Sequence, residues 1–154
     1  MIKILFVCHG NICRSPMAEF VMKDIVAKAG LSEEFYIESA ATSCEELGNG
    51  VYPPVKRLLD RLGIDSSGKT ARRITVEDYS KFDLIIGMDN ANMRNMLRFW
   101  KADTDDKLRL LMSYCNSSAE VADPWYTGDF EATWRDVTEG CNALLRQLRA
   151  AHGL

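Results

Sequence analysis

Short apolar runs alternate along this chain with segments of helical periodicity, and this alternation restricts the fold more than any other feature. Strands are predicted at 3–7, 35–39 and 83–87, where β-branched and aromatic residues lie between turn signals. A fourth apolar run at 107–114 fits a strand, although its Leu and Met residues also fit a helix. Alternating strands and helices predict an α/β fold, a doubly wound, four-stranded parallel sheet with helices on both faces.

Helical patterns follow each predicted strand. Helices are expected at 15–30 and at 53–63. Each segment has proline in its first turn and glycine at its end. A third is expected at 88–100. The strongest pattern is the last, at 130–151, where apolar residues recur every three or four positions and Asp129 is the expected N-cap.

Length and charge exclude several classes of protein. The 154 residues predict one domain, spanning 1–154. Nineteen basic residues stand against 22 acidic ones, and the chain has no basic stripe, so we expect no nucleic-acid partner. The chain has neither an apolar run of membrane-spanning length nor a signal peptide. We therefore expect a cytoplasmic monomer with no membrane association.

The cysteines argue against disulfides and against metal. Five are present, an odd number, and no export signal accompanies them, so a disulfide framework is not expected. No Cys-x-x-Cys pair exists and the two histidines are far apart in sequence, so a zinc site lacks ligands and we expect no metal. The cysteines are Cys8, Cys13, Cys44, Cys115 and Cys141.

Cys8 and Arg14 lie at the two ends of a short loop between the first predicted strand and helix. In a parallel sheet this position binds ligands, because helix N-termini and consecutive amides attract anions. Gly10 allows tight backbone turns, and the guanidinium of Arg14 can hold two phosphate oxygens. A Cys8 thiolate beside a bound phosphate is placed to attack phosphorus and form a phosphocysteine. The predicted phosphate-binding residues are His9, Gly10, Asn11, Ile12, Cys13, Arg14 and Ser15.

A second candidate segment, near the C-terminus, supplies a proton donor. Asp123 precedes Pro124, which stiffens the backbone beside the carboxyl group. Asp123 is therefore the candidate general acid for the departing oxygen. Trp125 and Tyr126 follow on the same loop and, with Ile12, are the candidate walls of a slot for an aromatic substituent.

These segments together resemble the low-molecular-weight protein tyrosine phosphatases. The family signature of Cys, five residues, Arg and Ser is present at 8–15, and the Asp-Pro-aromatic-Tyr segment at 123–126 is similar to the family's general-acid loop. Further similar segments, in the family's order, span nearly the whole chain; they are 39–43, 71–75, 87–89 and 128–131. The resemblance implies hydrolysis of phosphotyrosine in proteins or peptides, and of small aryl phosphates, without a cofactor.

The resemblance also implies a role for each matching residue. Cys8 is the implied nucleophile, Arg14 the phosphate clamp, and Asp123 first the acid and then the base that activates water. Ser15 is implied to hydrogen-bond the nucleophile. Asn11 and Ser43 are implied to support the loop, and Cys13 to trap oxidised Cys8 as a reversible disulfide.

The sequence departs from the family pattern at several positions. His9 stands where many members carry an apolar residue, and the stretch with Glu45 and Glu46 lacks a common aromatic residue. Lys69 stands near a loop-bracing histidine of several members. Trp125 replaces the first of two adjacent tyrosines.

Four alternative functions use similar features. The first alternative is a phosphoarginine phosphatase on this scaffold. Relatives of that type carry threonine at the position of Ile12, so this residue argues against it. An arsenate reductase would need extra cysteines around the third strand, and 82–89 contains none. A phosphocysteine carrier should lack Arg14 and Asp123. A silent phosphotyrosine-binding module should have lost Cys8 or Asp123. Phosphotyrosine hydrolysis therefore fits the sequence better than these alternatives.

Overall fold

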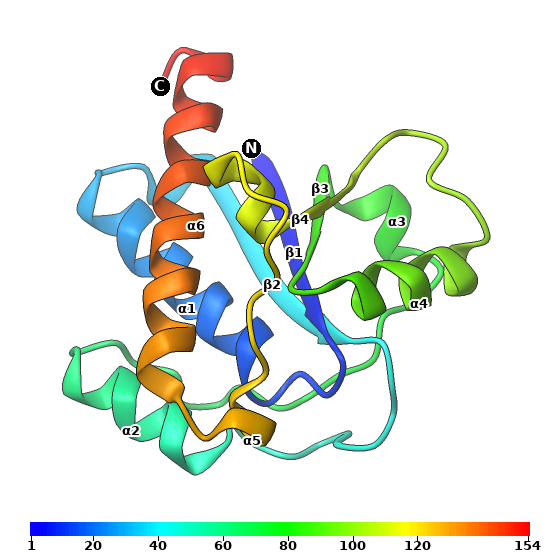
Figure 1. Cartoon of the computed structure of the whole chain (residues 1–154). Coiled ribbons are helices and arrows are strands. Elements are labelled where there is room, and N and C mark those ends of the chain that lie inside the picture. Colours follow the sequence, from blue (N-terminus) through cyan, green and yellow to red (C-terminus); the bar gives the residue numbers. More distant parts are fainter.

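The computed structural model describes residues 1–154 and contains one sheet of four parallel strands, as predicted (Figure 1). The strands are β1 (Ile2–Cys8), β2 (Phe35–Ala41), β3 (Leu84–Gly87) and β4 (Leu108–Leu110), in the order β2-β1-β3-β4. The chain moves outward from β1 to β2 and then crosses back to β3. The carboxyl end of β1 therefore lies at the switch point, where open α/β sheets bind ligands.

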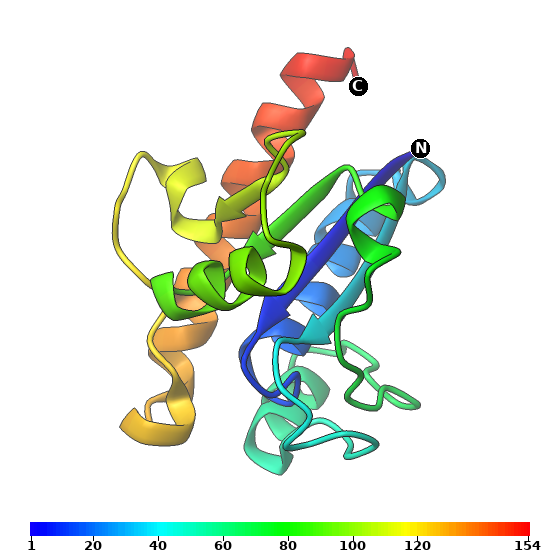
Figure 2. The ribbon, with the colours of Figure 1, turned by 90° about the vertical axis from the view of Figure 1, so that its right-hand side faces the viewer.

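Helices cover both faces of the sheet. Figure 1 shows α1 and α6 on one side and α3 and α4 on the other, and Figure 2 shows α4 in front of the strands. In both views α2 and α5 lie beyond the carboxyl end of β1. None of the helices is both long and apolar enough to cross a lipid bilayer. The α-helices are α1 (Arg14–Lys28), α2 (Pro53–Arg61), α3 (Asp78–Lys81), α4 (Asn90–Trp100), α5 (Pro124–Thr127) and α6 (Phe130–His152), and the 3₁₀ helices are η1 (Ser32–Glu34) and η2 (Leu111–Cys115).

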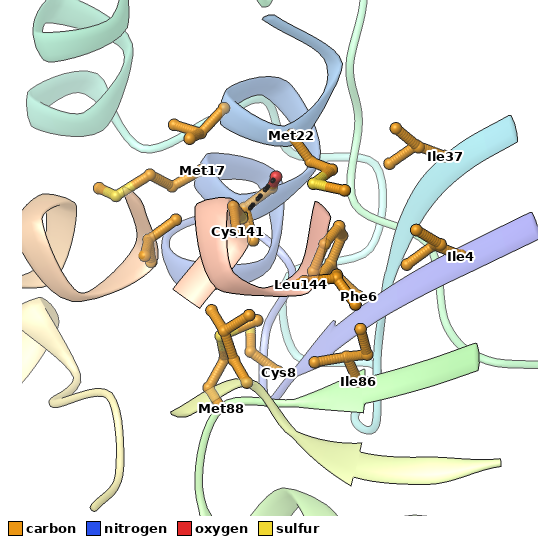
Figure 3. Packing of buried hydrophobic residues seen from close by; sticks show 14 of the residues in the cluster. Ile4, Phe6, Cys8, Met17, Met22, Ile37, Ile86, Met88, Cys141 and Leu144 are labelled. Carbon is orange, nitrogen blue, oxygen red and sulfur yellow. Dashed lines mark hydrogen bonds between the residues drawn. The ribbon is translucent and has the colours of Figure 1, made fainter. Parts of the chain in front are cut away.

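The central strand β1 is buried on both faces, which explains its continuous apolar sequence. Ile4, Phe6 and Cys8 belong to the core cluster beneath α1 and α6, whereas Leu5 and Val7 belong to the cluster on the α4 side. Figure 3 shows the first cluster around Phe6 and Leu144. Each large aliphatic or aromatic side chain buried there stabilises the fold by about 1.5–3 kcal/mol. Cys8 is thus fixed at the edge of the larger core.

Helix α6 approaches η2 most closely at a glycine. A Cβ atom built on Gly140 would lie 2.6 Å from Cγ of Leu111, which is fully buried. The absence of a side chain at position 140 therefore lets the long helix pack directly on the segment after β4.

The ambiguous run at 107–114 contains both a strand and a helix. Strand β4 covers only Leu108–Leu110, and η2 follows it directly. The helix expected at 88–100 starts at Asn90, because Asp89 is its N-cap. Three short helices, α3, α5 and η1, were not predicted, since one turn is too short to show helical periodicity.

Candidate active site

The β1–α1 loop, residues 8–15, curls around the sulfur atom of Cys8. The backbone N–H of Asn11 donates a hydrogen bond to Cys8 Sγ over 3.3 Å, and Ser15 Oγ lies 3.0 Å from the same sulfur. This path requires a left-handed residue, and Asn11 takes that conformation with φ of 59°. The sulfur therefore has two hydrogen-bonding partners within the loop.

The side chain of Asn11 holds the loop in this shape. Its Nδ2 donates to Ser15 Oγ over 2.8 Å and to Ser39 Oγ over 2.9 Å, and its Oδ1 accepts from the backbone N–H of Arg72 over 3.2 Å. Asn11 is 1 % exposed. The loop-support role expected for Asn11 thus corresponds to three buried or partly buried hydrogen bonds.

Ser43 supports the same loop from its rim. Its hydroxyl and its backbone N–H both donate to the carbonyl oxygen of His9, over 2.8 Å and 3.1 Å. The carbonyl of residue 9 is therefore directed toward Ser43, which favours an inward orientation of the neighbouring amides.

A buried charged network lies behind Ser39. The hydroxyl of Ser39 donates to Oε1 of Glu19 over 2.6 Å, and Lys69 Nζ donates to the carbonyl of Ser39 over 2.8 Å. Lys69 Nζ also lies 3.5 Å from Glu19 Oε1. Lys69, noted above as a departure from the family pattern, therefore bonds to the residues that support the loop. Burial lowers the pKa of Lys69 against the opposing attraction of Glu19.

Arg14 is held on the side facing β3 and the acid segment. Its Nη1 donates to Asp89 Oδ2 over 2.7 Å and to the carbonyl of Val121 over 2.9 Å. Its Nη2 lies 3.5 Å from Asp123 Oδ2. Burial would lower the pKa of Arg14, but the charges of Cys8, Asp89 and Asp123 outweigh it and raise that pKa. The guanidinium is therefore a fixed, permanent positive charge beside Cys8.

The two carboxylate oxygens of Asp123 have different partners. Its Oδ1 accepts from the backbone N–H of Trp125 over 3.0 Å and caps α5, while its Oδ2 faces Arg14. Pro124 is buried at the first position of that helix. Asp129, the expected N-cap, caps α6 by accepting from the N–H of Ala132 over 3.0 Å, as its sequence position predicts.

The pocket at the carboxyl end of β1 brings together Cys8, Arg14 and Asp123, although the third lies more than 100 positions from the others. At the rim, His9 Nε2 lies 3.0 Å from Glu45 Oε2. Ile12, Trp125 and Tyr126 line the same pocket, with the two aromatic residues 53 % and 85 % exposed. The full lining is Cys8, His9, Gly10, Ile12, Cys13, Arg14, Glu45, Glu46, Asp123, Trp125 and Tyr126.

Cys13 lies in the pocket lining and Cys141 in the core. Burial, together with the charge of Cys8, raises the pKa of Cys13 to about 12. Burial also raises the pKa of Cys141, whose Sγ donates to the carbonyl of Ala18 over 3.8 Å (Figure 3). Both thiols therefore stay protonated at neutral pH, but only Cys13 is beside Cys8.

Several site residues were missed by sequence reasoning. Glu19 lies in a helix without any motif. Ser39 and Arg72 lie in the family-like segments 39–43 and 71–75 but were given no role, and Arg72 contributes to the loop through its backbone. Asp89, which ends the family-like segment 87–89, both caps α4 and accepts a hydrogen bond from Arg14. A signal for Glu19 existed, since it lies on the side of α1 that carries the apolar residues Met22 and Val26.

Comparison with known proteins extends the resemblance over the whole chain. The family model described as "Low molecular weight phosphotyrosine protein phosphatase" matches residues 3–153. The low molecular weight protein-tyrosine-phosphatase YfkJ of Bacillus subtilis is 37 % identical over 151 residues, covering 97 % of each chain. The human low molecular weight phosphotyrosine protein phosphatase is 40 % identical over 156 residues, covering 94 % of each chain.

Solved structures agree with the sequence comparisons. The crystal structure of YfkJ superposes with a TM-score of 0.95 at 36 % identity, covering 99 % of this chain and 97 % of the other. The Drosophila arginine phosphatase superposes with a TM-score of 0.86 at 31 % identity, covering 96 % of this chain and 98 % of the other. With family model, relatives and fold in agreement, this chain belongs to the low molecular weight phosphotyrosine protein phosphatase family.

Proposed function

We propose that Cys8, Arg14 and Asp123 carry out the family's phosphotyrosine hydrolysis in this chain, in two steps through a phosphocysteine. The observation that supports this most is their convergence on one pocket, with the Asp123 carboxylate 3.5 Å from the guanidinium that faces Cys8. A nucleophile, an anion clamp and a proton donor within one cavity are the groups that phosphate monoester hydrolysis needs.

The phosphate group binds in the β1–α1 loop. Its oxygens take hydrogen bonds from the loop amides of residues 9–15 and from the guanidinium of Arg14, at the N-terminus of α1. Asp89 and Val121 occupy Nη1 of Arg14, which leaves Nε and Nη2 as donors for the phosphate, with Nη2 also 3.5 Å from Asp123 Oδ2. These donors stabilise the equatorial oxygens in both transition states.

In the first step the Cys8 thiolate attacks phosphorus, a sulfur–phosphorus bond forms and the bond to the tyrosyl oxygen breaks. Asp123, in its protonated form, gives its proton to that oxygen, and tyrosine leaves as the neutral phenol. The exposed edge of Asp123 opens on the pocket beside Trp125 and Tyr126, where the aromatic leaving group lies.

In the second step water attacks the phosphocysteine, and Asp123, now a carboxylate, accepts the proton of that water. The sulfur–phosphorus bond breaks, and Cys8 leaves as a thiolate. Ser15 Oγ, 3.0 Å from Cys8 Sγ, donates a hydrogen bond to the departing sulfur. Inorganic phosphate then leaves the pocket.

The substrate is a phosphotyrosine exposed on a protein or peptide. Ile12 packs against one side of the tyrosyl ring, with Trp125 and Tyr126 on the loop opposite, and all three line the pocket. Residues 1–154 act as one catalytic domain, because the residues assigned here converge on one pocket at the edge of a single sheet. The five free thiols support a reducing compartment such as the cytoplasm.

The test is hydrolysis of a phosphotyrosine peptide and a phosphoarginine peptide with a chelator present. Wild type is compared with Cys8→Ser and with Cys44→Ser, which changes an exposed cysteine outside the pocket lining. We expect phosphotyrosine turnover in wild type and Cys44→Ser, and none in Cys8→Ser. Turnover of phosphoarginine alone would transfer the assignment to the activity named for the Drosophila relative. Turnover that persists in Cys8→Ser would refute the nucleophile.

A further inference from the structure

We propose that Tyr52 is a positioning residue for the general acid, because its ring fixes the short helix α5 that carries Asp123. This inference rests on the role of Asp123 proposed above. Tyr52 does not line the pocket, so it acts through the acid segment and not on the substrate.

The backbone of Tyr52 is fixed to the β1–α1 loop. Its N–H donates to the carbonyl of Ile12 over 2.9 Å. Two prolines follow it at the start of α2, and a residue before proline is restricted to extended conformations. Tyr52 has φ of −54° and ψ of 130°, within that restriction. The position of its ring is therefore set relative to the loop that binds phosphate.

The ring of Tyr52 contacts both ends of the acid segment. Its centroid lies 4.9 Å from that of Trp125 in α5, with the planes at 53°. It also lies 5.9 Å from that of Phe130, the first residue of α6, in a stacked arrangement at 26°. Aromatic pairs at these separations attract beyond the effect of burial alone. Figures 1 and 2 agree that the start of α2 and α5 lie at the same end of the molecule.

Helix α5 has little other support on this side. It spans only Pro124–Thr127, and every residue after Pro124 is exposed, Trp125 by 53 % and Tyr126 by 85 %. The N–H of Trp125 donates directly to Asp123 Oδ1. Displacement of Trp125 therefore moves the Asp123 carboxylate, whose Oδ2 is 3.5 Å from Arg14. A shift of about 1 Å in a reacting group can lower a rate by roughly 100-fold.

The experiment compares kcat/KM for two aryl phosphates that differ in their need for a proton donor. Phenyl phosphate releases a basic oxygen and needs the acid, whereas 2,4-dinitrophenyl phosphate releases an acidic phenol and does not. We expect Tyr52→Leu to lower kcat/KM for phenyl phosphate by about 10-fold, a fraction of what a general acid contributes. The dinitrophenyl ester should change less than about 2-fold. Tyr52→Phe keeps the ring and should restore the wild-type ratio.

Combination with Asp123→Asn shows whether Tyr52 acts through the acid. If it does, Tyr52→Leu combined with Asp123→Asn should be no slower than Asp123→Asn alone. Inhibition by inorganic phosphate should be unchanged in Tyr52→Leu, because the backbone bond to Ile12 remains. Phe130→Leu weakens the same stack from α6 and should give a smaller effect with the same leaving-group pattern, even if Tyr52→Leu does not fold.

Two patterns would overturn the inference. In the first, Tyr52→Leu and Phe130→Leu lower kcat/KM equally for both esters, while Asp123→Asn lowers it mainly for phenyl phosphate. This result would refute the positioning role of Tyr52 and leave the role of Asp123 intact. In the second, the losses in kcat/KM for phenyl phosphate multiply when Tyr52→Leu and Asp123→Asn are combined, which would also refute the positioning role. If Asp123→Asn itself affected both esters equally, the acid assignment would fail and the role of Tyr52 with it.

Discussion

Replacement of Asn11 by glycine and by alanine separates the two functions of this residue. Glycine keeps the left-handed backbone without strain but loses the three side-chain hydrogen bonds to Ser15, Ser39 and the N–H of Arg72. At about 1 kcal/mol per bond, Asn11→Gly should lower the free energy of unfolding by about 3 kcal/mol. Asn11→Ala loses the same bonds and also places a Cβ-bearing residue without a polar side chain at φ of 59°. Its loss should be about 1 kcal/mol larger.

The assay is urea denaturation of the three proteins at neutral pH without phosphate, with the free energy of unfolding from linear extrapolation. Both variants should remain folded, because domains of this size have about 5–15 kcal/mol of stability. Equal midpoints for the glycine and alanine variants would refute the backbone argument. A loss below about 1 kcal/mol in Asn11→Gly would refute the importance of the hydrogen-bond network.

Three further predictions concern the core, pH and oxidation. Gly140→Ala should destabilise the protein by about 1–2 kcal/mol, since contact with Leu111 outweighs the gain in helix propensity; higher stability in urea would contradict this. Three hydrogen bonds, from one hydroxyl and two backbone amides, outweigh burial and lower the pKa of Asp103. The stabilising effect of Asp103 is therefore complete above its pKa in the unfolded chain, about 4, and is lost as the pH falls further. The difference in stability between wild type and Asp103→Asn should shrink below about pH 4, which acid titration followed by circular dichroism measures. After peroxide treatment, wild type should recover activity with dithiothreitol while Cys13→Ser should not, if Cys13 traps oxidised Cys8 as a disulfide, as the family resemblance implies; mass spectrometry that finds sulfinic acid on Cys8 and no disulfide in wild type would show otherwise.

The sequence predicted most of the fold because its elements have strong local signals. Strand β1 is apolar on both faces, α6 repeats its apolar pattern for 23 residues, and Asp129 has the expected capping position. The run at 107–114 was ambiguous for a physical reason. A three-residue strand followed by one 3₁₀ turn is too short for either periodicity to dominate.

The pocket residues were predictable because a nucleophile and a clamp stand in one short segment. The network of Glu19, Ser39 and Lys69 was not predicted, because its members come from different elements and no local pattern shows that they meet. Only the folded topology shows that the buried Glu19 carboxylate has Ser39 and Lys69 as partners in addition to Lys23, one turn further along α1. The contact of Tyr52 with Trp125 was invisible for the same reason.

The position of β1 between β2 and β3 has a consequence for the kinetics of inactivation. A strand paired on both sides is among the last segments to exchange its amide protons, whereas a one-turn helix near the surface opens at low cost. Cys8, the proposed nucleophile, ends the first kind of element, and Asp123, the proposed acid, caps the second. On gentle heating, turnover of basic leaving groups should therefore decay before the affinity for phosphate does. A molecule in that intermediate condition is still a receptor for phosphate, although it has ceased to be an efficient catalyst.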